Sequence, residues 1–239
     1  MIPSISDLIK SGNQFMESLC STENGRDMSW EYCYSTFATY KGKELTDKDL
    51  DYLCLHLAFY LASWGMYRGS SFLLQKDYKV HKSAIKELML AKYHPLWAVK
   101  CANFINKDND FQKILDILTE ELRNIYSEIR KSAKKSINKE IPKQTISDIL
   151  ITKILLGTLG CVPAYDFCFM EGVKKYEIEP INFGLKSISK LSEYYVENSG
   201  AFEDLRKKIF DDRRIKYPQM KVLDMCFWQI GYNLNGNNS

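Results

Sequence analysis

Residues 152–166 bring together the groups in this chain that are best suited to chemistry. Gly157 and Gly160 lie three residues apart at the end of an apolar stretch, and Pro163 suits the first turn of a following helix. A glycine-rich turn between two helices exposes backbone N–H groups, which bind a phosphate without any positive side chain. Asp166 follows one turn beyond Pro163, so we expect a carboxylate beside a phosphate-binding turn.

This segment resembles the hairpin of the helix-hairpin-helix superfamily of DNA glycosylases, roughly Leu-Pro-Gly-Val-Gly before a helix with alanine. Four positions match that pattern: Leu156, Leu159, Gly160 and Ala164. Two positions depart from the pattern, since Gly157 replaces the usual proline and Thr158 replaces the first hairpin glycine. The spacing also differs, because the superfamily places its catalytic aspartate farther beyond the hairpin than Asp166 lies in this chain. Some divergent relatives have a lysine on the first helix and then Pro-x-(Trp/Tyr)-Asp. Four positions fit this variant: Lys153, Pro163, Tyr165 and Asp166.

The resemblance implies hydrolysis of the N-glycosidic bond of a flipped, modified base, with Asp166 and Lys153 as catalytic residues. The carboxylate stabilises the positive charge that develops on the sugar, or orients the attacking water. The amine binds a phosphate or forms a Schiff base. Contacts to the DNA backbone are implied at Gly157, Thr158 and Gly160, and a bacterial phage-defence enzyme that removes hypermodified cytosine is one member that the resemblance suggests. The alternative is a plain connection between core helices, with Asp166 favoured by the helix dipole.

A second candidate segment, residues 62–71, ends the most apolar helix of the chain. Trp64 and Arg68 are four residues apart and share a helix face, so the pair can form a cation–π contact or stack a nucleobase. A charge at this place needs a partner, and Asp166 or a phosphate are both candidates. We expect four residues here to bind the substrate: Trp64, Tyr67, Arg68 and Ser70. The alternative has Arg68 capping the helix and Trp64 in the core.

Three further residues complete the predicted substrate site. Tyr165 precedes Asp166 and is expected to line the base pocket, while Asp224 and Trp228 lie four residues apart on an otherwise apolar helix. A buried acid usually has a hydrogen-bonding or charged partner. Asp224 therefore either orients Arg68 or Lys153, or serves only to cap or brace the packing.

The formal net charge is only +3, which argues against a uniformly basic surface. The excess of basic over acidic residues is concentrated in two stretches. Residues 130–143 contain six basic residues and one acid, and residues 206–221 contain seven basic residues and two acids. Either stretch can follow a phosphate backbone, and we expect Lys134 and Lys135 to do so. The alternative is that each stretch is a solvated face.

The elements that must position these residues are all helical. Hydrophobic residues make up 45% of the chain, and 12 glycines and six prolines are too few for a sandwich or barrel rich in turns. Apolar spacing and caps, such as a capping box at 46–49, predict helices over 5–19, 30–40, 47–67, 79–93, 95–106, 110–132, 146–156, 164–175, 182–196, 201–210 and 218–232. We expect a compact all-α domain over 1–232, two lobes around a cleft with a connection near 132–143, and a disordered tail over 233–239.

Other features limit the class of protein. No apolar run is long enough to span a membrane, and the N-terminus lacks the pattern of a signal peptide. The seven cysteines show no CxxC spacing, so we expect reduced thiols in a cytoplasmic protein, with no metal and no cofactor. The expected partner is double-stranded DNA, and a monomer is favoured. The competing hypothesis is a non-enzymatic all-α module that binds protein or nucleic acid in a defence or phage-related system.

Overall fold

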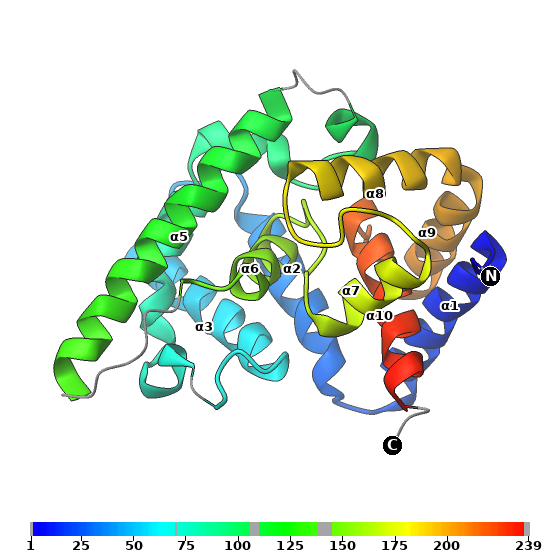
Figure 1. Ribbon diagram of the computed structural model, residues 1–239. Helices are drawn as coiled ribbons and strands as arrows, with labels where there is room; N and C mark the ends of the chain where they lie inside the picture. The colour runs from blue at the N-terminus through cyan, green and yellow to red at the C-terminus, as the bar shows by residue number, and fades with distance from the viewer. Residues whose placement is uncertain (1, 70, 106–109, 138–144, 237–239) are drawn as a thin grey trace.

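The computed structural model confirms the all-α prediction, because every regular element in its described residues is helical (Figure 1). It describes residues 2–69, 71–105, 110–137 and 145–236, with the backbone alone for 133–137. The α-helices are α1 (Ile5–Ser21), α2 (Ser29–Tyr40), α3 (Asp47–Ser63), α4 (Lys82–Leu88), α5 (Asp110–Ile137), α6 (Asp148–Thr158), α7 (Phe167–Lys175), α8 (Leu185–Glu197), α9 (Ser199–Arg213) and α10 (Gln219–Gly236). Short 3-10 helices are η1 (Arg26–Met28), η2 (Phe72–Gln75), η3 (Tyr78–His81), η4 (Ala91–Leu96) and η5 (Cys101–Phe104).

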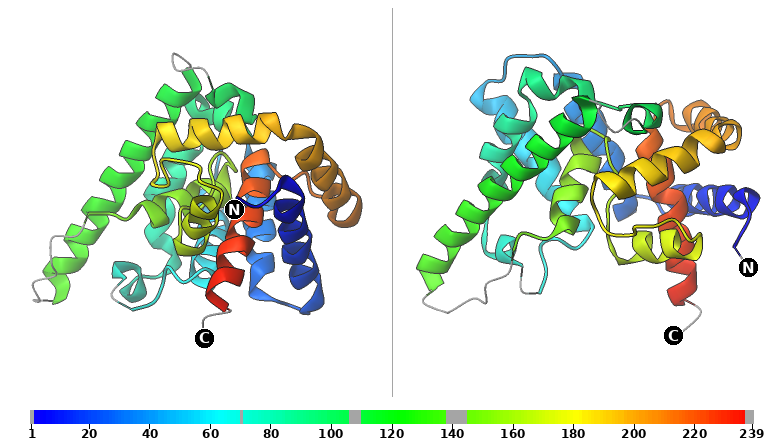
Figure 2. Two further views of the ribbon diagram at one scale, coloured as in Figure 1. Left: turned by 45° about the vertical axis from the view of Figure 1, so that its right-hand side comes forward. Right: turned by 45° about the horizontal axis from the view of Figure 1, so that its top comes forward.

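Helix α6 lies at the centre of the molecule, and every residue from Leu150 to Thr158 is buried (Figures 1 and 2). Its sequence is apolar nearly all round, which is the pattern of a helix that is enclosed on every side. Helices α2, α3 and α5 pack around it. Lys153 is thus held inside the core, on a helix that offers little contact with water.

Helices α7 and α10 form the most extensive helix pair among the described residues. Two glycines allow this approach. A Cβ atom on Gly172 would lie 2.0 Å from the carbonyl oxygen of Phe227, and one on Gly231 would lie 1.8 Å from that of Cys168. Because both obstacles are backbone atoms, no side-chain movement relieves them. The close crossing sets the start of α7 against the part of α10 around Gly231, and the connection before α7 reaches Asp224 one to two turns earlier on α10, where the candidate site lies.

The helix starts follow local capping chemistry. Thr46 and Asp49 form the predicted capping box: the hydroxyl of Thr46 accepts from the N–H of Asp49 at 3.3 Å, and the Asp49 carboxylate accepts from the N–H of Thr46 at 2.8 Å. Ser4 and Asp7 form a second box at α1. These bonds satisfy backbone donors that a helix cannot pair by itself, and they set where the first turns begin.

Several predicted boundaries were wrong. The described part of the expected helix over 95–106 is not α-helical, because Pro95 and the positive φ of Ala98 (48°) leave only the 3-10 turns η4 and η5 there. Helix α3 ends at Ser63 rather than 67, before a turn with Gly65 at a φ of +78°. Helix α7 begins at Phe167 rather than 164.

The organisation also differs from the sequence prediction. Helix α5 runs on to Ile137, so the first part of the expected connection at 132–143 is helical, and 138–144 lie outside the described residues. Helix α10 includes 233–236 of the expected tail, and 237–239 are not described. The buried apolar side chains of the core, from Leu8 to Phe227, form one continuous cluster. The two lobes around a cleft stay a prediction.

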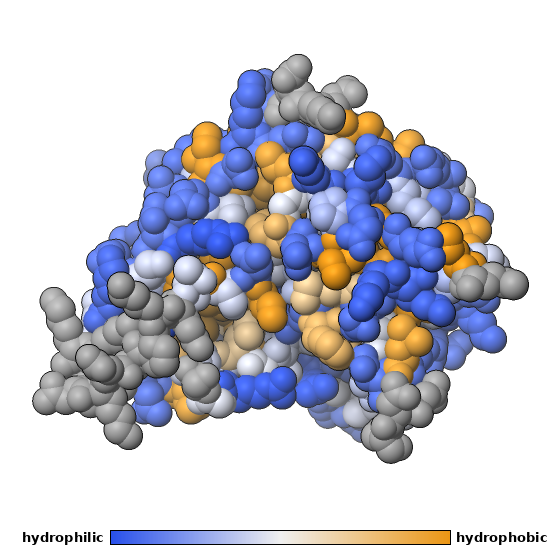
Figure 3. Space-filling view, in the orientation of Figure 1, coloured by the Kyte–Doolittle hydropathy of each residue, from blue (hydrophilic) through white to orange (hydrophobic). Residues whose placement is uncertain are grey.

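The surface is mainly hydrophilic on the face shown in Figure 3. Figure 3 shows hydrophilic residues over most of one face, with hydrophobic side chains in small groups between them. Among the described residues, no helix has the length and apolar character that crossing a bilayer requires.

Candidate functional site

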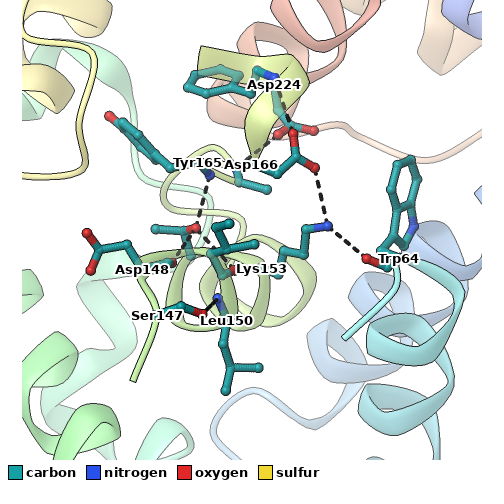
Figure 4. A network of polar contacts seen from close by, with 12 residues as sticks. Trp64, Ser147, Asp148, Leu150, Lys153, Tyr165, Asp166 and Asp224 are labelled. Atoms are coloured by element: carbon teal, nitrogen blue, oxygen red, sulfur yellow. Dashed lines mark hydrogen bonds and ion pairs between the residues drawn. The ribbon is translucent and has the colours of Figure 1, made fainter. Parts of the chain in front are cut away.

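An ion pair between Lys153 and Asp166 joins α6 to the start of α7. The amine of Lys153 lies 3.2 Å from Oδ2 of Asp166 and donates a hydrogen bond to the backbone carbonyl of Trp64 at 2.9 Å. Asp166 is the N-cap of α7, and its Oδ1 accepts from the N–H of Phe169 at 3.2 Å. The two side chains are 6% and 15% exposed, so the pair is largely removed from water (Figure 4).

A second ion pair lies on α10 beside the first. The amine of Lys221 lies 2.8 Å from Oδ2 of Asp224, and Oδ1 of Asp224 accepts from the N–H of Ala164 at 2.9 Å. Burial raises the pKa of Asp224, and the neighbouring Asp166 raises it further, while Lys221 and the Ala164 N–H oppose the increase. Asp224 thus fixes the backbone two residues before Asp166, and it lies in the same cluster as Lys153 rather than near Arg68.

Aromatic rings lie close to both amines, three of them to Lys221 and one to Lys153. The ammonium of Lys221 lies 5.0 Å from the ring centre of Trp30, 5.1 Å from that of Phe15 and 6.0 Å from that of Trp64. The amine of Lys153 lies 5.7 Å from the ring centre of Trp64. Cation–π attraction partly offsets the cost of removing these charges from water.

Two tryptophans, Trp64 and Trp228, lie beside the two Lys–Asp pairs and form what we call the tryptophan wall. The rings of Trp64 and Trp228 meet edge to face at 5.6 Å, and Trp228 stacks on the exposed ring of Tyr232 at 5.0 Å. Both tryptophans are only partly buried. The indole Nε1 of Trp64 is a buried donor without a hydrogen-bond partner among the described residues.

The two ion pairs and the two tryptophans line a cavity of about 10 Å³. Six of its lining residues are Trp64, Lys153, Asp166, Lys221, Asp224 and Trp228. A volume of this size holds about one water molecule and no nucleobase. The cavity must therefore enlarge before it can hold an organic ligand beside the Lys153–Asp166 pair.

The connection between α6 and α7 does not expose its glycines as expected. Gly157, Thr158 and Gly160 are all buried. A Cβ on Gly157 would lie 2.4 Å from the ring of Tyr60, and one on Gly160 would lie 2.4 Å from Pro218. These glycines serve close packing, and their placement does not support the predicted contacts to the DNA backbone.

Tyr165 also differs from its predicted role. Its ring is 1% exposed and does not line the cavity, because its hydroxyl points to Ser187 and donates a hydrogen bond to that side chain at 2.9 Å. Its backbone N–H donates to Oγ1 of Thr152 at 3.0 Å (Figure 4). Tyr165 therefore holds the connection between α6 and α7 in place. Asp166 follows it as the N-cap of α7.

Other predicted site residues lie elsewhere. Arg68 is exposed and lines a different cavity, so it does not meet Asp166. The hydroxyl of Tyr67 lies 2.7 Å from Nε2 of the buried His81. Ser70 and the side chains of Lys134 and Lys135 lie outside the described residues.

The second basic stretch is partly neutralised within the protein. Three of its side chains have acidic partners: Glu203 for Arg206, Glu31 for Arg213 and Asp224 for Lys221. This stretch is consequently a weaker candidate for a phosphate-binding face than its composition suggested. In the described part of the chain, no three side chains of His, Cys, Asp or Glu gather in a way that could hold a metal ion.

Sequence reasoning missed Lys221 as a member of the site. One signal was present, since Lys221 precedes Asp224 by three residues on an apolar helix, and side chains at this spacing are neighbours on one face. Tyr60 was also missed: it lines the cavity, and burial followed by the charges of Asp224, Cys33 and Asp166 raises its pKa well above the usual value. No local pattern marks it.

These features define the candidate site as two buried Lys–Asp pairs behind a tryptophan wall. Searches against protein-family models, curated proteins and solved structures each found no match to this chain.

Proposed function

We propose that the protein is a DNA glycosylase that hydrolyses the N-glycosidic bond of a base turned out of the duplex. One observation carries this proposal: a carboxylate, that of Asp166, lies at a helix N-terminus beside a buried lysine and a wall of tryptophans. Bond cleavage places positive charge on the sugar, and a fixed carboxylate stabilises that charge. The adjacent aromatic rings suit the planar base.

The proposed roles follow from the contacts of each group. Water attacks C1′ of the sugar, the C1′–N bond breaks with its electron pair leaving on the base, and Asp166 takes a proton from the water. Lys153 acts as a positioning residue, because its amine already donates to the Trp64 carbonyl and pairs with Asp166. An amine in these contacts is a poorer nucleophile than a free one, so hydrolysis by water is favoured over a Schiff base.

Access to Asp166 requires Trp64 and Trp228 to separate. Their edge-to-face contact at 5.6 Å closes a cavity of about 10 Å³, and both rings are partly exposed already. We expect a flipped base to insert between these rings, which exchanges one aromatic contact for another.

The test is release of a base. Duplex DNA with unmodified or modified bases is incubated with the protein and then treated with alkali, which breaks strands at abasic sites. Asp166→Asn should lower base release about 100-fold or more, because the amide cannot stabilise the cation. Asp204→Asn changes an exposed aspartate on α9 and should have no effect. If no DNA yields breaks, or if Asp166→Asn matches the wild type, the glycosylase proposal is wrong.

A second candidate is a non-enzymatic module that binds protein or nucleic acid. The observation in its favour is that both lysines and both aspartates already have partners, around a cavity that holds about one water. Buried ion pairs of this kind also serve to specify a fold. This function predicts that Asp166→Asn leaves the binding of the protein or nucleic-acid partner unchanged and that no base is released from any DNA.

A further inference from the structure

The side of α3 that faces water is apolar. From residue 52 to the end of the helix, each exposed position holds an apolar side chain: Tyr52, Leu55, Phe59 and Ala62. The three large ones are 49%, 52% and 53% exposed. A helix on the surface of a protein normally turns polar residues toward water, and an apolar face is normally buried against another element. Helix α3 therefore carries a face that the rest of the described chain leaves uncovered.

These four residues, which we call the α3 seam, have the spacing of a coiled-coil interface. They follow each other at intervals of three, four and three residues, which are the a and d positions of a heptad repeat. Lys48 continues the same register, four residues before Tyr52. An apolar stripe with this spacing is covered best by a second helix that crosses at a small angle, about 20°.

The α3 seam is complementary to itself when two copies run antiparallel. A two-fold axis at the level of Leu57 places Tyr52 opposite Ala62 of the second copy. The same axis places Leu55 opposite Phe59 of the second copy. The largest side chain thus faces the smallest, and the two intermediate ones face each other, so the layers fill similar volumes. A parallel pair would instead set Tyr52 against Tyr52 and leave Ala62 against Ala62.

The charges at the two ends of α3 also suit an antiparallel pair. Its first turn holds Asp47 and Asp49, and its last turn holds no basic residue, although the negative end of the helix dipole favours a cation there. From the core, the buried amine of Lys153 reaches only the Trp64 carbonyl. Lys48 is exposed and has no ion-pair partner among the residues that the structure describes. Antiparallel pairing carries its ammonium toward the last turn of the second α3.

The area of the α3 seam sets how tightly two copies can associate. A large side chain buries about 150–250 Å² in full, so three that are half exposed offer about 300 Å² per copy. A groove beside the seam, lined by Thr36, Tyr40 and Tyr52, adds contact area between α2 and α3. A standard interface buries about 800 Å² per partner. The area therefore favours a reversible dimer over an obligate one.

We propose that the α3 seam is the interface of a symmetric homodimer in which two α3 helices pack antiparallel. This differs from the monomer that the sequence favoured. The driving force is the removal of apolar side chains from water, and no charged residue lies within the seam to oppose it. The interface uses no residue of the two Lys–Asp pairs, so it does not depend on the glycosylase proposal.

Sedimentation equilibrium of the full chain, from about 10 μM to 1 mM, tests the interface. The wild type should change from monomer to dimer over this range. Leu55→Glu and Phe59→Lys should each weaken the association about tenfold or more, because each buries an unpaired charge in an apolar layer. Ile117→Glu is the matched control: it introduces a charge at an apolar position of α5 that is also 53% exposed, and it should dimerise like the wild type.

A mixture of the two variants tests the antiparallel register. Leu55 of one copy faces Phe59 of the other, so a mixed dimer of Leu55→Glu with Phe59→Lys has one layer of opposite charges and one unchanged apolar layer. The mixture should therefore associate more tightly than either variant alone. This recovery also separates a lost interface from a lost fold, because a misfolded chain would not regain association on mixing.

Three results would overturn the proposal. The first is a wild type that remains monomeric at about 1 mM, and the second is a dimer that Leu55→Glu and Phe59→Lys leave unchanged. The third is a mixture that associates no better than its components, which contradicts the antiparallel pairing. If the chain stays monomeric and binds phosphatidylcholine vesicles in a way that Leu55→Glu abolishes, the seam contacts a membrane and the homodimer is wrong. Base release by the wild type does not bear on any of these results.

Discussion

Lys221 and Asp224, three residues apart on α10, form an ion pair at 2.8 Å with side chains only 3% and 7% exposed. The carboxylate also accepts the N–H of Ala164, so this pair ties α10 to the connection before α7. A charged group at this depth is stable only with its partner, because the energy of removing a charge from water is large.

Removal of either member of this pair should destabilise the fold strongly. We expect Asp224→Ala to lower the free energy of unfolding by about 3–5 kcal/mol, since it leaves the ammonium of Lys221 buried and unpaired. The double variant Lys221→Met with Asp224→Ala should lose less than the sum of the single variants. Urea unfolding measures all three, and additive losses would show that the two side chains do not interact.

Asp166 has a structural role that can be separated from its proposed chemical one. Asparagine also caps helices, so Asp166→Asn should keep most of the cap on the Phe169 N–H, whereas Asp166→Ala should cost about 1 kcal/mol more. Thermal and urea unfolding of the two variants checks this difference. Equal stabilities would mean that the cap contributes nothing to α7.

The buried His81 should make stability depend on pH. Its two ring nitrogens lie 2.7 Å from the hydroxyls of Tyr67 and Tyr126, and burial lowers its pKa from 6.5 to about 3. The unfolded chain binds the proton more readily, so stability is full above pH 6.5 and falls as the pH decreases toward 3. The loss at pH 5 should be about 2 kcal/mol.

His81→Gln is the control for this prediction, because glutamine can donate and accept hydrogen bonds but does not titrate. Its stability at pH 7 is expected to be lower, with a flatter profile between pH 5 and 7. His56 and His94 are present in both proteins, so their contributions cancel. A wild-type profile with the same slope as the variant would contradict the assignment.

The crossing of α7 and α10 should tolerate no side chain at its glycines. Gly231→Ala places a Cβ 1.8 Å from the carbonyl oxygen of Cys168, and we expect a loss of about 3 kcal/mol or more. Gly200→Ala, on α9, meets nothing within 4 Å and should be neutral or stabilising by about 0.5–1 kcal/mol. Guanidinium unfolding distinguishes the two variants, and a neutral Gly231→Ala would show that the helices can separate.

Sequence pattern alone determined the class of fold and most helices. Apolar spacing predicted α6 as a buried helix over 146–156, and the structure places it at 148–158. The capping box at Thr46 and Asp49 was also predicted correctly. These features depend on neighbours within about four residues, so a local pattern is enough to identify them.

The start of α7 was harder to predict, because two local signals competed. Pro163 suits a first helical turn, yet the helix begins after Asp166, whose carboxylate caps it. Ala164 and Tyr165 instead donate their N–H groups to Asp224 and Thr152. The acceptors of these two bonds lie on α10 and α6, so the course of the chain before α7 depends on helices that the local pattern does not show.

The sequence identified Lys153, Asp166 and Asp224 as charged residues in apolar surroundings, but it did not show their partners. Tertiary structure decided that Lys153 meets Asp166, that Lys221 meets Asp224, and that Arg68 faces a different cavity. The physical reason is the range of the forces involved. Helix formation depends on bonds between near neighbours, whereas a buried charge finds its partner only where packing brings distant helices together.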